Sequence, residues 1–252
     1  MKKSVLVIVL FAFFISCSTE QTNNAQKIKN DRSELNLKGN VKSVREINYT
    51  VIDKLGEIQK GNKQGESYIL FNNKGNMIEQ NSDAGVSRKF IFKYDDKGNK
   101  IEANFYKGSS SEVREKTTFK YDDKRNMIEA VDDNDGKRFT FKYDDNGNKI
   151  EANIYEGGSS SVSSKITFKY DDKGNNIEQS QCNSDGSDCV KQTFKYDDKG
   201  NKIEWKMYKK DRLQVNETIK FKKFDSVDNW IESIVFEDDK PRLITEREIE
   251  YY

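Results

Sequence analysis

A short repeated string constrains the fold of this chain more than any other feature of its sequence. Phe-Lys-Tyr-Asp-Asp occurs five times, at residues 92–96, 119–123, 141–145, 168–172 and 194–198. Each copy is followed by two residues and Asn, then by one further residue and Ile-Glu. Degenerate copies begin at Phe71 and Phe224, so the array has seven units, or eight if a vestige at residues 52–56 is counted. Such repetition predicts stacked copies that together bury a face which one copy cannot bury alone.

Each unit has the pattern of a β-hairpin. The alternating polarity of Thr-Phe-Lys-Tyr is typical of a half-buried strand. Asp-Asp-Lys-Gly-Asn predicts a tight turn in which an Asp side chain caps the backbone and Gly takes a left-handed conformation. The structural turn glycines are Gly75, Gly98, Gly147, Gly174 and Gly200, and Arg125 and Asp228 stand at the same place in their units.

The spacing of turns predicts an all-β fold. Loose Gly/Ser/Asp-rich turns separate the units, so tight and loose turns alternate about every 12 residues. We expect an antiparallel β-hairpin meander of about 14–16 strands over residues 39–252, because short turns place successive strands side by side. A sheet of this size should twist into a curved or partly closed single sheet, with an aromatic interior and an exterior rich in Lys and Glu.

The register of the hairpins has two interpretations. A three-residue loop with a glycine bulge places Tyr94 opposite Lys100, whereas a two- or four-residue loop places Tyr94 opposite Asn99 and Phe92 opposite Ile101. The second keeps the apolar residues on one face. The first is favoured because apolar residues replace Lys100 in other units, namely Met77, Met127 and Trp230. A slip of one residue exchanges the two faces, so the inner face stays unassigned.

The N-terminus predicts a processing signal and a tether. Lys2 and Lys3 precede an apolar run over residues 5–15, which is too short to span a bilayer comfortably as a helix. We predict a signal peptide over residues 1–16 and, over residues 17–38, a lipidated Cys17 with a flexible polar tether. The alternative is an ordinary secretory signal with an incidental cysteine.

The residues around Cys17 resemble the bacterial lipobox. Ser16 and Cys17 fit that motif, although Phe14 replaces its usual Leu. The resemblance implies that Cys17 is acylated, so that the protein associates with a membrane through its N-terminal lipid. Ser18 follows the cysteine where Asp would signal retention. By resemblance to Gram-negative lipoproteins, this implies the outer membrane, without indicating the periplasmic or the surface face.

The repeat resembles the YD (RHS) repeat of bacterial secreted and surface proteins. The matching residues are Tyr94-Asp95 and Gly98-Asn99 with their later copies, over about residues 45–252. The chain departs from that repeat in having mostly Lys directly after Gly-Asn, where Leu is usual. Large YD-repeat proteins form a shell around a toxin. We expect seven units to be too few to enclose anything.

Composition excludes several classes of function. Lys and Arg number 44 against 43 Asp and Glu, so no net positive field attracts nucleic acid. The chain has no histidine, which excludes His-based triads, His zinc sites and His general bases. Only 34% of the residues are hydrophobic, which argues against a polytopic membrane protein. We predict no cofactor.

The paired aspartates have a structural and a catalytic interpretation. Pairs such as Asp95-Asp96 could serve a metal site or a glycosidase. Because the pair recurs in five units, we favour turn capping, with neither a catalytic site nor a metal site. The acidic loop at residues 132–136 does not match the glycine spacing of an EF-hand.

Two cysteines flank a polar turn late in the array. Cys182 and Cys189 predict a disulfide across a hairpin outside the cytoplasm. Two cysteines without histidine make a poor zinc site, and a redox pair would more often have the Cys-x-x-Cys spacing.

The aromatic rows are candidates for both core and binding residues. Aromatic side chains on a sheet pack a core, yet they also grip sugar rings or peptides. The candidate binding aromatics are Phe92, Tyr94, Phe119, Tyr121, Phe141, Tyr143, Phe168, Tyr170, Phe194 and Tyr196. Lys and Glu rows, such as Lys93 with Glu102, are expected on a solvated face.

These observations favour a membrane-anchored, non-catalytic repeat lipoprotein, a scaffold or binding module for a protein or glycan at the cell envelope. The alternatives are a carboxylate-based hydrolase of envelope polysaccharide, and an accessory or immunity protein of a secreted toxin. A hydrolase would need a non-repeated pair of buried acids in a cleft, and no such pair is evident in the sequence.

Overall fold

A computed structural model describes residues 30–252 of the chain as a closed β-barrel with one short helix. The helix is α1 (Asp31–Glu34). The strands are β1 (Val41–Lys54), β2 (Glu57–Phe71), β3 (Met77–Asp83), β4 (Ser87–Tyr94), β5 (Lys100–Lys107), β6 (Glu115–Tyr121), β7 (Met127–Asp132), β8 (Arg138–Tyr143), β9 (Lys149–Tyr155), β10 (Ser164–Tyr170), β11 (Asn176–Asn183), β12 (Val190–Tyr196), β13 (Lys202–Lys209), β14 (Arg212–Phe224), β15 (Trp230–Glu237) and β16 (Lys240–Tyr251). Within residues 30–252, no helix is long and apolar enough to cross a membrane.

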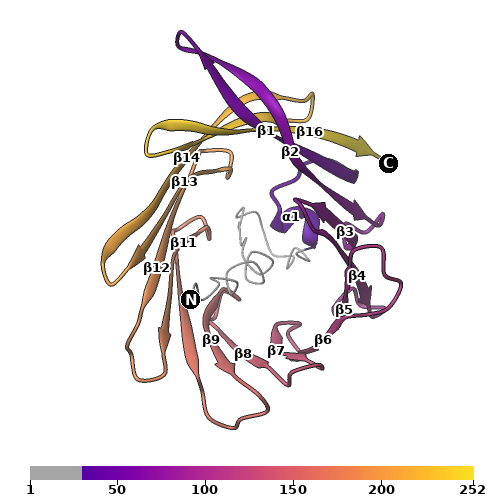
Figure 1. The fold of residues 1–252 in the computed structure, drawn as a ribbon. Coiled ribbons are helices and arrows are strands. Elements are labelled where there is room, and N and C mark those ends of the chain that lie inside the picture. The colour runs from indigo at the N-terminus through magenta and orange to yellow at the C-terminus, as the bar shows by residue number, and fades with distance from the viewer. Residues whose placement is uncertain (1–29) are drawn as a thin grey trace.

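The sheet is an antiparallel meander in which every strand pairs with its sequence neighbours (Figure 1). The prediction of an all-β hairpin meander is confirmed. Full closure goes beyond a partly closed sheet: β1 pairs with both β2 and β16, so Val44 lies opposite Ile69 and Ile249. Closure leaves no edge strand unpaired.

The expectation that seven units are too few to enclose anything was wrong. Seven tight-turn hairpins supply 14 strands, from β2–β3 to β14–β15, and β1 and β16 complete the ring. The strands β1 and β16 lie largely outside the repeat. Their pairing with each other joins the two ends of the array, and the closed ring surrounds α1 (Figure 1).

The structure selects the first of the two registers. Tyr94 lies opposite Lys100, with a bulge between Lys93 and Tyr94. The Gly98 N–H donates to the Asp95 carbonyl oxygen at 2.9 Å, which closes the three-residue loop. In consequence Ile101 points away from the aromatic row and is 41% exposed.

Contacts with α1 identify the inner face. The Tyr94 hydroxyl donates to Asp31 of α1, which lies inside the ring of strands (Figure 1). Phe92 shares this face because side chains alternate along a strand. Lys93 and Glu102 therefore project outward. The interior is aromatic, and a buried cluster there comprises Phe119, Ala130, Phe141, Ala152, Ile154, Ile166 and Phe168.

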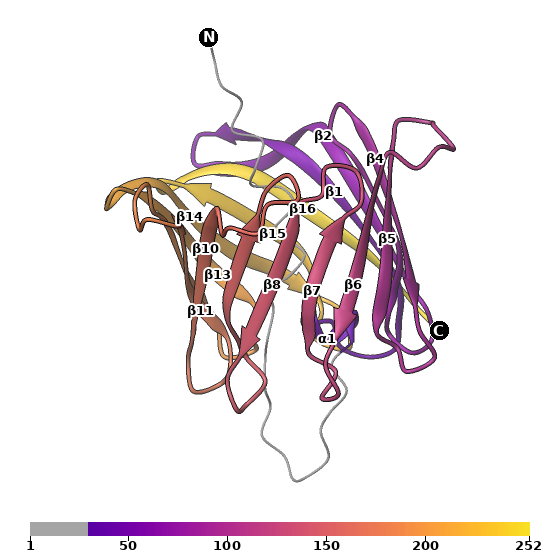
Figure 2. The ribbon, with the colours of Figure 1, turned by 90° about the horizontal axis from the view of Figure 1, so that it is seen from below.

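The predicted tether is too long at its C-terminal end. Residues 17–29 lie outside the described residues, as does the predicted signal peptide over residues 1–16. Residues 30–38, however, fold into the barrel: α1 is capped by Asn30, and Arg32 is buried. The polar side chains that suggested a solvated tether instead bond to the barrel wall. We call residues 30–38 the plug; it lies at the tight-turn end of the barrel (Figure 2).

Candidate functional site

The tight turns use the first aspartate of each pair as a clamp. Asp95 accepts hydrogen bonds from the Asn99 backbone N–H and from Asn99 Nδ2, both at 2.8 Å. The same two bonds recur in four further units, between Asp122 and Asn126, Asp144 and Asn148, Asp171 and Asn175, and Asp197 and Asn201. Residues 30–252 contain no group of three or more acidic, Cys or His side chains arranged to hold a metal ion.

The residue before the last asparagine of the tight turn is left-handed in every unit. φ lies between 78° and 86° at Gly75, Gly98, Gly147, Gly174 and Gly200. Arg125 and Asp228 adopt φ values of 68° and 70° at the same place. Arg125 has a compensating role, since its Nε donates to Asn99 Oδ1 of the preceding turn at 3.0 Å.

The tyrosines link neighbouring units. Tyr121 donates to the Lys100 carbonyl oxygen at 2.9 Å, and Tyr143 donates to the Met127 carbonyl oxygen at 2.8 Å. Tyr170 and Tyr196 repeat this bond to the preceding unit. Burial raises the pKa of Tyr196 to about 12, so the hydroxyl stays protonated and donates. The sequence shows the tyrosine but not this bond.

The phenylalanines of the repeat form an inner row. They are only 8–9% exposed, and each lies next to its unit's tyrosine on the inner face; the five are Phe92, Phe119, Phe141, Phe168 and Phe194. Their packing supports the wall of the barrel. Their predicted role in binding stays a prediction.

Three lysines accompany this row inside the barrel. Lys100 Nζ lies 4.6 Å from the centroid of the Phe92 ring. Lys149 and Lys202 lie 4.4 Å from the rings of Phe141 and Phe194. Each ammonium faces a π-system, which attracts a cation electrostatically. In the sequence, this position bears only on the register of the hairpin, and the row of inner cations is not evident from it.

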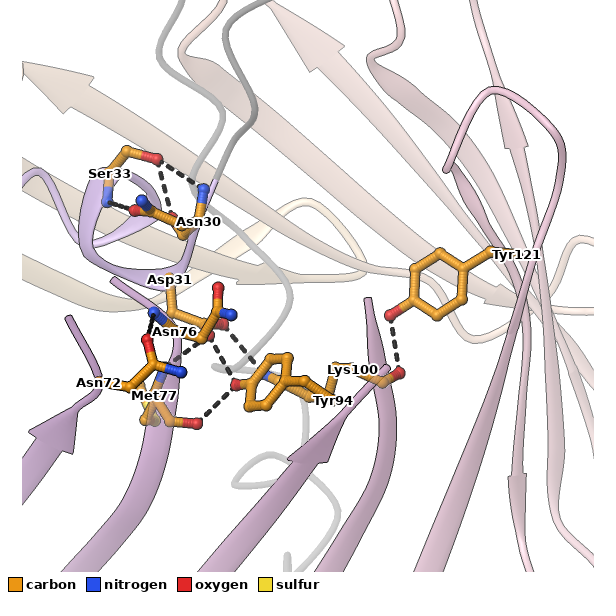
Figure 3. Close-up of polar contacts among 9 residues, drawn as sticks. All are labelled: Asn30, Asp31, Ser33, Asn72, Asn76, Met77, Tyr94, Lys100 and Tyr121. Atoms are coloured by element: carbon orange, nitrogen blue, oxygen red, sulfur yellow. Dashed lines mark hydrogen bonds and ion pairs between the residues drawn. The ribbon is translucent and has the colours of Figure 1, made fainter. Parts of the chain in front are cut away.

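One of these lysines binds a carboxylate of the plug. Asp31 Oδ1 lies 3.0 Å from Lys100 Nζ, while Asp31 Oδ2 accepts from the Tyr94 hydroxyl and the Met77 N–H, both at 2.7 Å (Figure 3). The side chains of Asp31 and Lys100 are 13% and 18% exposed. Lysine, tyrosine and a backbone amide thus form a carboxylate-binding constellation on the inner wall.

The plug bridges distant turns at this end of the barrel. Arg32 donates from its guanidinium to the Val41 and Asn73 carbonyl oxygens, at 3.0 and 3.1 Å. Asn36 donates to Asn201 Oδ1 at 2.9 Å. The first contacts involve β1 and the β2–β3 turn and the last involves the β12–β13 turn, so the plug crosses the interior.

A second inner cluster lies outside the repeat. Arg247 on β16 pairs with Glu46 on β1 at 2.7 Å and lies 3.3 Å from the centroid of the Trp230 ring. Burial lowers the pKa of Arg247, and the Glu46 carboxylate opposes that shift. This pair is non-repeated and charged, yet the two residues are 201 positions apart, so the sequence could not bring them together.

The outer wall is covered by ion pairs. Glu102 lies between Lys93 at 2.7 Å and Lys116 at 3.3 Å. Hydrogen bonds from Lys93 and Asn104 hold the pKa of Glu102 at about 2. Equivalent outer pairs recur around the barrel, namely Lys120–Glu129, Lys142–Glu151, Lys169–Glu178, Lys195–Glu204 and Lys223–Glu232. The predicted charged exterior is present.

The late hairpin contains the predicted disulfide. Cys182 and Cys189 are joined across the turn that connects β11 and β12. Cys17 lies outside the described residues.

Residues 52–194, more than half of the chain, match the model of a protein family described as "Uncharacterised protein". The chain belongs to this family. None of the curated proteins matches the sequence.

One solved structure with a similar fold is that of a porin-like protein. This porin-like protein, from Bacteroides uniformis, is 11% identical, with a TM-score of 0.55, over 83% of this chain and 98% of that chain. Two structures of TcdB2-TccC3 are each 11% identical, with TM-scores of 0.31 and 0.33. They match 76% and 81% of this chain but only 13% and 15% of their own.

Proposed function

We propose that the protein is a lipid-anchored, non-catalytic barrel of the cell envelope, in which the wall serves as a binding module for a protein or glycan. The observation that carries this proposal is the outer wall of Lys–Glu pairs. It separates the barrel from lipid, although the fold is shared with a porin-like protein.

A charged outer wall is costly in a membrane. A lysine on the lipid face of a membrane barrel costs about 2–4 kcal/mol at the bilayer midplane. Here Lys93, Lys120, Lys142, Lys169 and Lys195 all project outward and are exposed. The outer wall of such a barrel is therefore exposed to water, and the lipid on Cys17 anchors the protein to the membrane. The proposed location is the outer membrane of a Gram-negative bacterium.

The use of the acidic groups supports a non-catalytic role. The first aspartate of each turn is held by its asparagine, and the outer glutamates are held by lysines. Of the two inner charged pairs described above, Asp31–Lys100 joins the plug to the wall and Glu46–Arg247 joins β1 to β16. These carboxylates therefore have structural partners that explain them.

Substitution of Cys17 tests the anchor. The wild-type protein should sediment with membranes through a salt wash and dissolve in mild detergent, because acyl chains hold it. Cys17→Ser should be released into the soluble fraction or keep its signal peptide. A matched control is the double variant Cys182→Ser/Cys189→Ser, which should fractionate like the wild type. If processed Cys17→Ser still resists salt and alkaline extraction, the barrel itself associates with lipid and the proposal fails.

A further inference from the structure

We propose that Lys202 forms, with Phe194 and Tyr196 on the inner wall, a binding site for the carboxylate of a ligand with an apolar body. The inference rests on the binding role proposed above and names a ligand class for it.

The plug provides the internal precedent. In the second unit, Lys100, Phe92 and Tyr94 surround the carboxylate of Asp31. In the sixth unit, Lys202, Phe194 and Tyr196 take the same places, with Lys202 Nζ 4.4 Å from the Phe194 ring. Because the units repeat, a lysine above a phenylalanine ring and opposite a tyrosine recurs in the sixth unit, where the Tyr196 hydroxyl donates to the Asn176 carbonyl oxygen.

Lys100 has a carboxylate partner, Asp31, and Lys202 has none among residues 30–252. Over residues 30–252, no carboxylate lies within ion-pair distance of Lys202, and its only described contact is the Phe194 ring. Glu204 pairs with Lys195 and Lys206 on the outer face. Glu217 lies opposite Trp205 on the inner face and pairs with Arg242. Burial of Lys202 lowers the pKa of its ammonium, and the Phe194 ring is the group that faces it.

The surroundings of Lys202 favour an apolar ligand body. Trp205 lies opposite Phe194 on the inner face, and Met207 follows two residues later on that face. Unlike Phe194, both are only partly buried, as is Ile219 on β14. Apolar side chains that face the interior and remain accessible supply contact area for the body of a ligand, while Lys202 supplies the charge.

Titration with 4-phenylbutyrate tests the site. Isothermal calorimetry on the detergent-solubilised full chain should show binding of 4-phenylbutyrate and much weaker binding of the neutral 4-phenylbutanol. Lys202→Met should weaken 4-phenylbutyrate binding about tenfold or more, because a charge-assisted hydrogen bond is lost. Methionine already occupies this position as Met77 and Met127, so the variant suits the repeat.

Control variants distinguish the proposed ligand site at Lys202 from the proposed lipid anchor at Cys17. Lys195→Met removes an outer lysine of the adjacent strand and should leave 4-phenylbutyrate binding unchanged, while circular dichroism verifies the fold of both variants. Absence of 4-phenylbutyrate binding to the wild type, equal binding to Lys202→Met, or equal binding of the alcohol overturns the inference. The fractionation of Cys17→Ser does not involve Lys202, so either proposal can fail alone.

Discussion

At the scale of single residues, the turn position before the last asparagine shows how the repeat accommodates backbone strain. Glycine adopts positive φ there without cost, since it has no β-carbon. Arg125 adopts the same conformation and gains hydrogen bonds to Asn99 and the Lys97 carbonyl oxygen. The effect of a substitution at this position on stability should therefore depend on how well the new residue tolerates positive φ and on which hydrogen bonds its side chain can form.

Gly147→Val should lower the free energy of unfolding by about 1–2 kcal/mol, because a β-branched residue resists positive φ. φ is 79° at Gly147, and an added β-carbon would meet only Asn126 Oδ1 at 3.9 Å, so backbone strain dominates. Thermal unfolding should show a melting temperature lower by a few degrees. Gly147→Asn should lose less, since asparagine tolerates this region. Equal stability of Gly147→Val and wild type would contradict the turn geometry.

The residue scale also shows which details could be read from the sequence. The positive-φ glycine and the capping aspartate follow from local turn chemistry, and both are visible in five residues of sequence. The bond from Tyr121 to the Lys100 carbonyl oxygen depends on the bulge, and the bulge sets which strand residues face each other. The pattern left two registers open, so this contact could not be predicted.

At the scale of elements, the plug is the part that sequence reasoning missed. A helix of four residues leaves no periodic pattern, and Asp31 and Arg32 are typical of solvated segments. Their partners include the Lys100 side chain, the Val41 carbonyl oxygen at the start of β1, and the carbonyl oxygens of Asn73 and Gly75 in the β2–β3 turn. Only the closed barrel places these groups around one short segment, so local pattern alone predicts a tether.

Asp31→Asn should lower the free energy of unfolding by about 3 kcal/mol, because it leaves the Lys100 ammonium buried without a partner. Asparagine keeps an acceptor for the Met77 N–H, so the loss of charge is isolated. Chemical denaturation should detect the change. The double variant Asp31→Asn/Lys100→Met should recover part of the stability, whereas Asp96→Asn in an exposed turn should have no effect. If Asp31→Asn unfolds with the same free energy as the wild type, the ion pair between Asp31 and Lys100 does not stabilise the plug.

At the scale of the whole molecule, the two faces of one closed sheet have different roles: the inner face packs apolar side chains and the outer face is charged. The inner face buries the repeat's phenylalanines and leaves inner cations over their rings, while the outer face forms a lattice of Lys–Glu pairs. Strand number and polarity followed from turn spacing. Closure did not, because it requires the pairing of β1 with β16, two strands at opposite ends of the chain and largely outside the repeat.

The outer lattice should make the stability of the whole barrel sensitive to acid. Hydrogen bonds from lysines hold the pKa values of Glu102 and Glu151 at about 2, below their ordinary value of 4.5. Between these values the unfolded chain binds more protons than the folded barrel, so stability is full above about pH 5 and falls as the pH drops toward about 2. The melting temperature measured across this range should decline accordingly.

Glutamine substitutions isolate the two glutamates responsible. In Glu102→Gln/Glu151→Gln, the melting temperature at pH 7 should be lower than in the wild type, because each residue loses ion pairs to two lysines. Its decline between about pH 5 and pH 2 should be shallower, because two groups with lowered pKa values no longer titrate. Glu112→Gln, on an exposed loop, should follow the wild-type profile. Parallel profiles for the double variant and the wild type would show that these two glutamates do not cause the acid sensitivity. The Asp–Asn pairs of the tight turns would then be responsible, because hydrogen bonds from the asparagines also lower the pKa values of Asp95 and Asp122.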